Sequence, residues 1–121
     1  MVDATRAFSG FSVDDIDRAR DFYGRTLGLV VHDQGGMLGI DIGAGSVLVY
    51  PKPGHQPASF TILNFPVDDI EKAVDDLVAA GVEMLRYDGF DQDERGIMRG
   101  GGPLIAWFAD PAGNVLSVLQ G

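Results

Sequence analysis

The sequence lacks several patterns that would place the protein in a specialised class. It contains no cysteine, which excludes disulfides, thiolate zinc sites and a cysteine nucleophile. No apolar run approaches the ~18 residues of a transmembrane helix. The first residues, MVDATRAF, also lack the apolar segment of a secretory signal. We therefore expect a cytoplasmic protein with no membrane partner.

Basic side chains are scarce as well. Nine of them stand against 18 acidic side chains, which gives a formal net charge of -9. This negative field repels a phosphate backbone, so the composition predicts no nucleic-acid partner. Hydrophobic residues make up 45% of the 121 residues, and this share is typical of one folded domain with a modest core.

The feature that the sequence does contain is an internal repeat. FSVDDIDRARDFYGRTLG begins at Phe11, and FPVDDIEKAVDDLVAAG begins 54 residues later, at Phe65. Each copy has an apolar strand-like start and a helix with one apolar stripe, and each helix ends at a glycine, as helices often do. We place the N-caps at Asp14 and Asp68, because another acidic residue follows each of them three positions later.

Three strand-like runs follow each helix. They are LVVHD, MLGIDI and SVLVY in the first copy, separated by Gly35-Gly36 and by residues 43–45. In the second copy they are VEMLRYD, PLIAWFAD and NVLSVLQ. Each half is therefore predicted to be a βαβββ module.

The two modules together predict an α+β fold with a single domain over residues 1–121. The first module spans about residues 6–51, a proline-rich linker spans about 52–57, and the second module spans about 58–120. Because each helix covers only one face of its sheet, we expect two mixed sheets that curl around a shared cleft. Each module would also leave an edge strand bare, which predicts a homodimer.

The repeat and the last hairpin resemble the vicinal oxygen chelate superfamily, which includes glyoxalase I, the bleomycin-resistance proteins and the extradiol dioxygenases. VDDIDRARDFYGRTLGL, FPVDDIEKAVDDLVAAGVE and IAWFADPAGNVLSV carry the resemblance, which covers nearly the whole chain. It implies metal ligands at positions that here hold Phe8, Ile62, residues 47–50, and Leu116 or Ser117. None of these residues supplies a carboxylate or an imidazole. We therefore expect no metal and no other cofactor.

The candidate ligand-binding residues gather around the last hairpin. DPAGN has the chemistry of a tight turn that pairs Asp110 with Asn114, so Trp107 should lie opposite Ser117 on one face. The resemblance implies that this face holds ligands, and strand alternation adds neighbours to it. The predicted ligand-binding residues are Phe8, Ser12, Tyr50, Ile62, Asn64, Arg99, Trp107 and Ser117. The alternative is that Phe8, Ile62 and Trp107 simply fill the core.

Three functions stay open from the sequence. The leading hypothesis is a metal-free protein that binds a small, partly aromatic organic molecule, as the drug-sequestering members of the resembled family do. The alternative is a lyase, isomerase or dioxygenase-type enzyme with a non-standard site. Such an enzyme would use either a displaced metal or Tyr50, Glu83 or His32 as general acid or base. A structural or regulatory protein without a ligand is the third hypothesis. No sequence feature names the ligand or assigns a catalytic residue.

Overall fold

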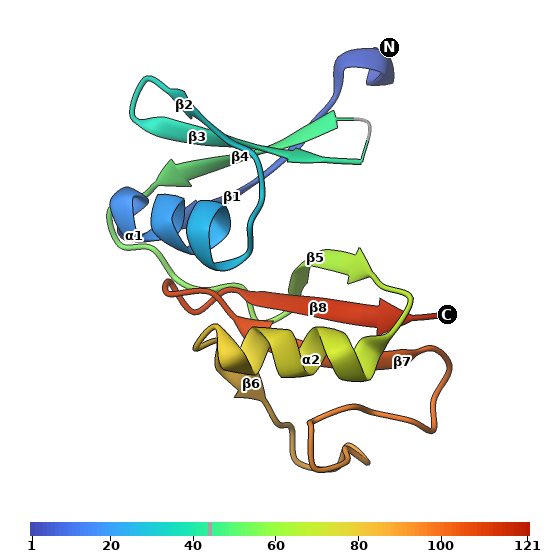
Figure 1. Cartoon of the computed structure of the whole chain (residues 1–121). Helices are drawn as coiled ribbons and strands as arrows, with labels where there is room; N and C mark the ends of the chain where they lie inside the picture. Colours follow the sequence, from blue (N-terminus) through green and yellow to red (C-terminus); the bar gives the residue numbers. More distant parts are fainter. Residues whose placement is uncertain (44) are drawn as a thin grey trace. The chain divides into compact units, whose positions relative to one another are not determined.

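The chain forms two compact units, Met1–Gln56 and Pro57–Gly121, which are called the first and the second module below. The computed structural model in Figure 1 describes residues 1–43 and 45–121. Ala44, which belongs to a predicted glycine-rich turn, lies outside the described residues. No helix among the described residues is long and apolar enough to cross a membrane.

The first module is built as the repeat predicts. A short 3-10 turn, η1 (Ala4–Arg6), precedes β1 (Ser9–Val13), α1 (Ile16–Asp21) and a π-helical turn, η2 (Phe22–Thr26). Three strands follow: β2 (Val31–Gln34), β3 (Met37–Ile42) and β4 (Gly45–Pro51). The sheet has the order β1-β4-β3-β2, in which β1 and β4 are parallel and the other neighbours are antiparallel. These elements confirm a βαβββ module (Figure 1).

The second module repeats this topology. Its elements are β5 (Thr61–Pro66), α2 (Ile70–Ala79), β6 (Met84–Leu85), β7 (Leu104–Ala109) and β8 (Val115–Gln120). The sheet order is β5-β8-β7-β6, again with one parallel pair, β5 with β8. The first of the three expected runs, VEMLRYD, forms only the two-residue strand β6. Neither sheet is strongly curled (Figure 1), which differs from the curvature that we expected. Four short strands show the ordinary twist of a sheet and no more.

The two helix caps lie one residue later than predicted. Asp15, rather than Asp14, accepts hydrogen bonds from the backbone N–H groups of Asp17 and Arg18. Asp69, rather than Asp68, accepts a hydrogen bond from the N–H group of Lys72. Both caps have extended backbone angles and directly precede an isoleucine that starts the helix. An N-cap carboxylate satisfies N–H groups that have no partner within the helix.

Each module has its own core between its sheet and its helix. In β1, Phe11 and Val13 are buried while Gly10 is exposed and Ser12 is half-buried. This alternation is typical of a sheet with one covered face. The second module shows the same pattern around Leu63 in β5, and α2 packs against β7 and β8. The face of each sheet that points away from its own helix is called its open face below.

Candidate functional site

A row of four residues crosses the open face of the second module. Asn64 on β5 pairs with Ser117 on β8, Ser117 pairs with Trp107 on β7, and Trp107 pairs with Leu85 on β6. The predicted hairpin register, with Trp107 opposite Ser117, is thereby confirmed. Because cross-strand partners share a face, these four side chains lie side by side. They bring together three of the predicted ligand-binding residues.

A polar pair lies at one end of this row. The Ser117 hydroxyl donates a hydrogen bond to Asn64 Oδ1 over 2.5 Å. Ser117 is completely buried, whereas Asn64 is exposed. A buried hydroxyl needs a hydrogen-bond partner, and Asn64 provides it. The pair therefore places a fixed amide group at the surface of the open face.

Three aromatic rings form a cluster at the other end of the row. Tyr87, Phe90 and Trp107 lie with each pair of ring centroids 5.5 Å apart. Tyr87 meets Trp107 edge-on, at 87°, and Phe90 meets it at 53°. These distances and angles are those of favourable aromatic contacts. Trp107 is half-buried and Phe90 is 48% exposed, so the aromatic cluster is accessible from one side.

Tyr87 and Phe90 are not among the predicted ligand-binding residues. Tyr87 belongs to the predicted strand-like run VEMLRYD and Phe90 lies just beyond it, whereas in the structure both follow the short strand β6. The signal that points to them is the pairing of Leu85 with Trp107, because residues just beyond a strand stay close to the partner strand. A turn closed by the bond from Phe90 N to Tyr87 O, with Gly89 at φ 84°, carries Phe90 back to the indole.

The loop that carries these rings is held by two polar side chains. Gln92 Oε1 accepts a hydrogen bond from Tyr87 N, and Gln92 Nε2 donates to the carbonyl oxygens of Leu85 and Gly96. Asp93 Oδ1 accepts from the backbone N–H groups of Arg95 and Ile97. This loop therefore has a fixed internal structure.

The pKa of Asp93 lies below its usual range. Burial acts to raise this pKa, but hydrogen bonds from the Ile97 backbone, the Arg99 guanidinium and the Arg95 backbone together lower it by more than burial raises it. Arg99 Nε donates to Asp93 Oδ2 over 2.9 Å, and Arg99 also pairs with Glu71 of α2 over 3.2 Å. These contacts raise the pKa of Arg99, with Asp93 as the largest cause. The structure thus places Arg99 between two carboxylates beside α2, apart from the row that contains Trp107.

The remaining predicted residues are Ile62 in the second module and Phe8, Ser12 and Tyr50 in the first. Ile62 is half-buried at an irregularity in the register of β5. Phe8 is 68% exposed, so it does not fill the core. Ser12 and Tyr50 are partners on the open face of the first module, and the Ser12 hydroxyl lies 2.7 Å from His55 Nδ1.

A hollow of about 310 Å³ occupies the open face of the first module beside Phe8. Its walls are mainly apolar. Gly39 allows the Gln34 amide to lie over the sheet, because a Cβ atom at Gly39 would collide with Gln34 Nε2. The residues that line this hollow are Phe8, Gln34, Met37, Gly39, Ser46, Val47 and Leu48. The first module therefore offers a small apolar depression in which Phe8 is the one aromatic residue among the described residues that line it.

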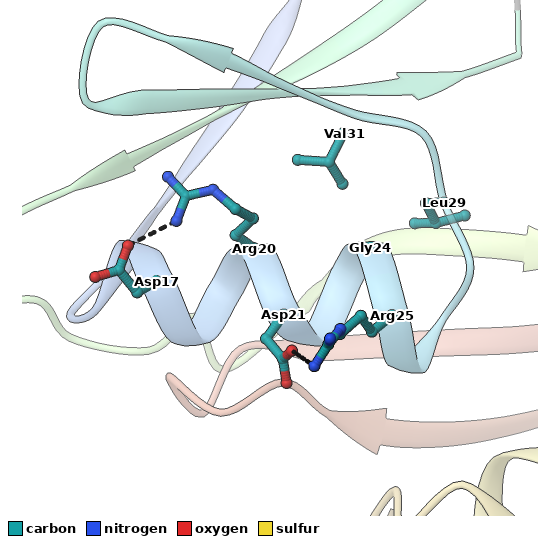
Figure 2. A pocket seen from close by; sticks show the side chains of 7 residues that line it. All are labelled: Asp17, Arg20, Asp21, Gly24, Arg25, Leu29 and Val31. Atoms are coloured by element: carbon teal, nitrogen blue, oxygen red, sulfur yellow. Dashed lines mark hydrogen bonds and ion pairs between the residues drawn. The ribbon is translucent and has the colours of Figure 1, made fainter.

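A second hollow of the first module, about 400 Å³, lies beside α1 (Figure 2). Its charged side chains pair with one another: Arg20 with Asp17 over 2.6 Å, and Arg25 with Asp21 over 3.4 Å. Leu29 and Val31 supply its apolar wall. None of the predicted ligand-binding residues lines it.

The donor chemistry does not fit a metal site of the resembled kind. Phe8 and Ile62 carry no nitrogen or oxygen in their side chains, and the Ser117 hydroxyl is buried against Asn64. Among residues 1–43 and 45–121, no three His, Asp or Glu side chains come together in a way that could hold a metal ion. The positions at which the resemblance implies ligands thus lack carboxylate and imidazole groups, which are the usual protein ligands of such metals.

Comparisons with known proteins identify the family. Residues 7–118 match the Glyoxalase/Bleomycin resistance protein/Dioxygenase superfamily. No curated protein matches the chain.

Several solved structures share the fold. A hypothetical protein from S. aureus is 19% identical, with a TM-score of 0.72 over 100% of this chain and 95% of that chain. The fosfomycin resistance protein FosX from Mesorhizobium loti is 14% identical, with a TM-score of 0.69 over 100% of this chain and 94% of that chain. TnmS3, an antibiotic binding protein from Streptomyces sp. CB03234, is 26% identical, with a TM-score of 0.69 over 98% of both chains. The chain belongs to the glyoxalase/bleomycin resistance/dioxygenase superfamily.

Proposed function

We propose that this superfamily member binds a small, partly aromatic organic molecule on the open face of its second module, without a metal ion. The observation that carries the proposal is the position of the half-buried Trp107, which belongs to the accessible aromatic cluster and lies beside the polar pair of Asn64 and Ser117. Aromatic walls with a few fixed polar groups are the usual design of a site for small molecules. The absence of nitrogen and oxygen donors at Phe8 and Ile62 supports binding without the family's metal.

The likeness to TnmS3 supports the same proposal. That protein is described as antibiotic binding, and it matches 98% of this chain at 26% identity. We therefore expect the ligand to be a drug-like compound with at least one planar ring. This expectation also matches the net charge of -9, which disfavours polyanionic ligands.

Binding can be measured through Trp107, because it is the only tryptophan of the chain. We expect a panel of neutral planar compounds to contain at least one that changes the Trp107 emission and raises the melting temperature, since a ligand of the native state stabilises it. Trp107→Ala should weaken the affinity for that compound by about 1–3 kcal/mol, as the loss of an aromatic anchor does. Calorimetric titration measures this change in the variant that lacks the indole.

Two further variants make the test specific. Trp107→Phe keeps a ring and should retain most of the affinity. Val78→Ala removes an exposed apolar side chain from α2, on the helix side of the module, and should leave the affinity unchanged. Unaltered binding in both Trp107 variants, together with a large loss of stability in Trp107→Ala, would show that the indole is a core residue and that the proposed site is misplaced.

A homodimer remains our prediction. The sheet order leaves β1 and β2 at the edges of one sheet and β5 and β6 at the edges of the other. Exposed sheet edges tend to pair with further strands. Light scattering on the eluting protein measures the mass, and a monomer of 12.9 kDa at working concentration would contradict this prediction.

A further inference from the structure

The orientation of the Asn64 amide determines what the open face can offer to a ligand. Asn64 Oδ1 accepts the proton of the buried Ser117 hydroxyl. The amide oxygen is therefore turned toward the sheet, and the NH₂ group is left on the exposed side of the residue. No hydrogen bond among the described residues uses Asn64 Nδ2. The open face thus presents a hydrogen-bond donor.

The distance between this donor and the aromatic cluster follows from the sheet. Asn64 lies on β5 and Trp107 on β7, with Ser117 of β8 between them in the same row. Neighbouring strands lie about 4.8 Å apart, so the two positions are separated by roughly 10 Å. A planar ring system stacked on Trp107 therefore extends over Ser117 toward Asn64, and a carbonyl group on the edge of that ring system can face the amide.

The charges of the second module indicate that the acceptor on the ligand is neutral. Its four basic side chains already contact oxygen atoms of the module. Lys72 pairs with Asp76, Arg86 donates to two carbonyl oxygens, Arg95 pairs with Asp75, and Arg99 pairs with Asp93. A carboxylate or phosphate on the ligand would find no uncommitted cation there, whereas a neutral carbonyl needs only an N–H donor.

We infer that the open face of the second module selects planar aromatic molecules that carry a neutral carbonyl group. The ring stacks against Trp107, and Asn64 Nδ2 donates a hydrogen bond to the carbonyl oxygen. Ser117 is a positioning residue, since its hydrogen bond holds the amide with its NH₂ group outward. This inference rests on the proposed function and adds the chemical class of the ligand.

The test compares two probes of nearly the same shape, 9-fluorenone and fluorene, of which only the first has a carbonyl. Equilibrium dialysis gives the dissociation constant of each probe. We expect wild-type protein to bind fluorenone about 3- to 10-fold more tightly than fluorene, the range that one neutral hydrogen bond supplies. Asn64→Asp keeps an acceptor for Ser117 but offers no donor, so the ratio of the two constants should fall to about 1 or below.

Two other variants separate this effect from charge and from packing. Gln56→Glu introduces the same change from amide to acid at an exposed residue of the first module and should keep the wild-type ratio. Ser117→Ala releases the Asn64 amide and should lower the ratio toward 1 while fluorene binding stays the same. A structural defect would instead weaken both probes together. The melting temperature of each variant checks that it is folded.

The outcomes distinguish a failure of this inference from a failure of the proposed function on which it rests. Equal affinity of wild-type protein for the two probes, or a wild-type ratio preserved in Asn64→Asp, would overturn the carbonyl preference while leaving ligand binding on Trp107 intact. Failure of both probes to bind wild-type protein, together with no response of Trp107 to any planar compound, would overturn the proposed function and the inference with it.

Discussion

The two modules share a scaffold but differ on their open faces. In both, a strand leads into a helix that an aspartate caps, Asp15 in the first module and Asp69 in the second. Both sheets also have the same strand order. The first module joins β2 to β3 through Gly35 and Gly36 alone, whereas residues 86–103 connect β6 to β7 in the second. The repeated part of the sequence builds the scaffold, and the part that differs builds the surface.

Equivalent rows of the two sheets make the difference concrete. In the first module the row is Gly10, Leu48, Gly39 and His32; in the second it is Asn64, Ser117, Trp107 and Leu85. Two glycines therefore stand where the second module has an amide and an indole. Glycine in a strand allows another group to approach the backbone closely, as the Gln34 amide does over Gly39. One scaffold thus carries a small apolar hollow in one copy and an aromatic surface in the other.

The largest expected loss of stability comes from a core aromatic residue, Tyr23, which we compare with the half-buried Trp107. Tyr23 is completely buried, with its ring 5.8 Å from Phe11 and 5.1 Å from Phe22. We expect Tyr23→Ala to lower the free energy of unfolding by about 3–5 kcal/mol, because it leaves a cavity. Trp107→Ala should lower the free energy of unfolding by at least about 1 kcal/mol less than Tyr23→Ala does, since Trp107 is only half-buried. Urea unfolding followed by circular dichroism measures both, and equal losses would contradict the contrast.

The next effect concerns the loop that only the second module has. Asp93→Asn should lower the free energy of unfolding by about 1–3 kcal/mol, since the carboxylate accepts hydrogen bonds from Arg99 and from two backbone N–H groups. The pKa of Asp93 is lowered on folding. Its contribution is therefore complete above the unfolded pKa of about 3.9 and is lost as pH falls through the lower folded value.

Acid titration of Trp107 fluorescence measures this loss. The loop holds Tyr87 and Phe90 against the indole, so the emission should change below about pH 4 in wild-type protein. In Asp93→Asn the altered emission should already be present at neutral pH. The same acid transition in both proteins would show that another carboxyl group controls the loop.

The smallest effect is expected where the modules are alike. Asp15→Ala and Asp69→Ala should each lower the free energy of unfolding by about 1 kcal/mol, because each removes the carboxylate that caps a helix. Asp15 accepts two backbone N–H groups and Asp69 accepts one, so the loss at Asp15 should equal or slightly exceed the loss at Asp69. Thermal unfolding compares the pair. Asp14→Ala and Asp68→Ala serve as matched controls without a cap, and a loss as large in these controls would contradict the cap assignment.

The sequence predicted the scaffold more completely than the site. The sequence predicted that Trp107, Ser117 and Asn64 share a face, because strand alternation and the DPAGN turn determine which side chains lie side by side. Tyr87 and Phe90 were missed, since their contact with Trp107 depends on a loop whose path the hydrogen bonds of Gln92 determine. The caps were placed one residue early because each helix is preceded by two consecutive aspartates, and only backbone angles identify which of them is the cap.

The sequence by itself determined two βαβββ modules, one helix in each of them and the register of the last hairpin. Hydrophobic periodicity, the residues that start and end a helix, and the residues that form a turn all act over a few neighbouring positions. A short stretch of sequence therefore contains this information. The tertiary structure alone decided that Arg99 pairs with Glu71, 28 residues earlier in the chain, and that three aromatic rings meet at Trp107. Such contacts depend on how a long loop returns to its own module, and no local pattern encodes that path.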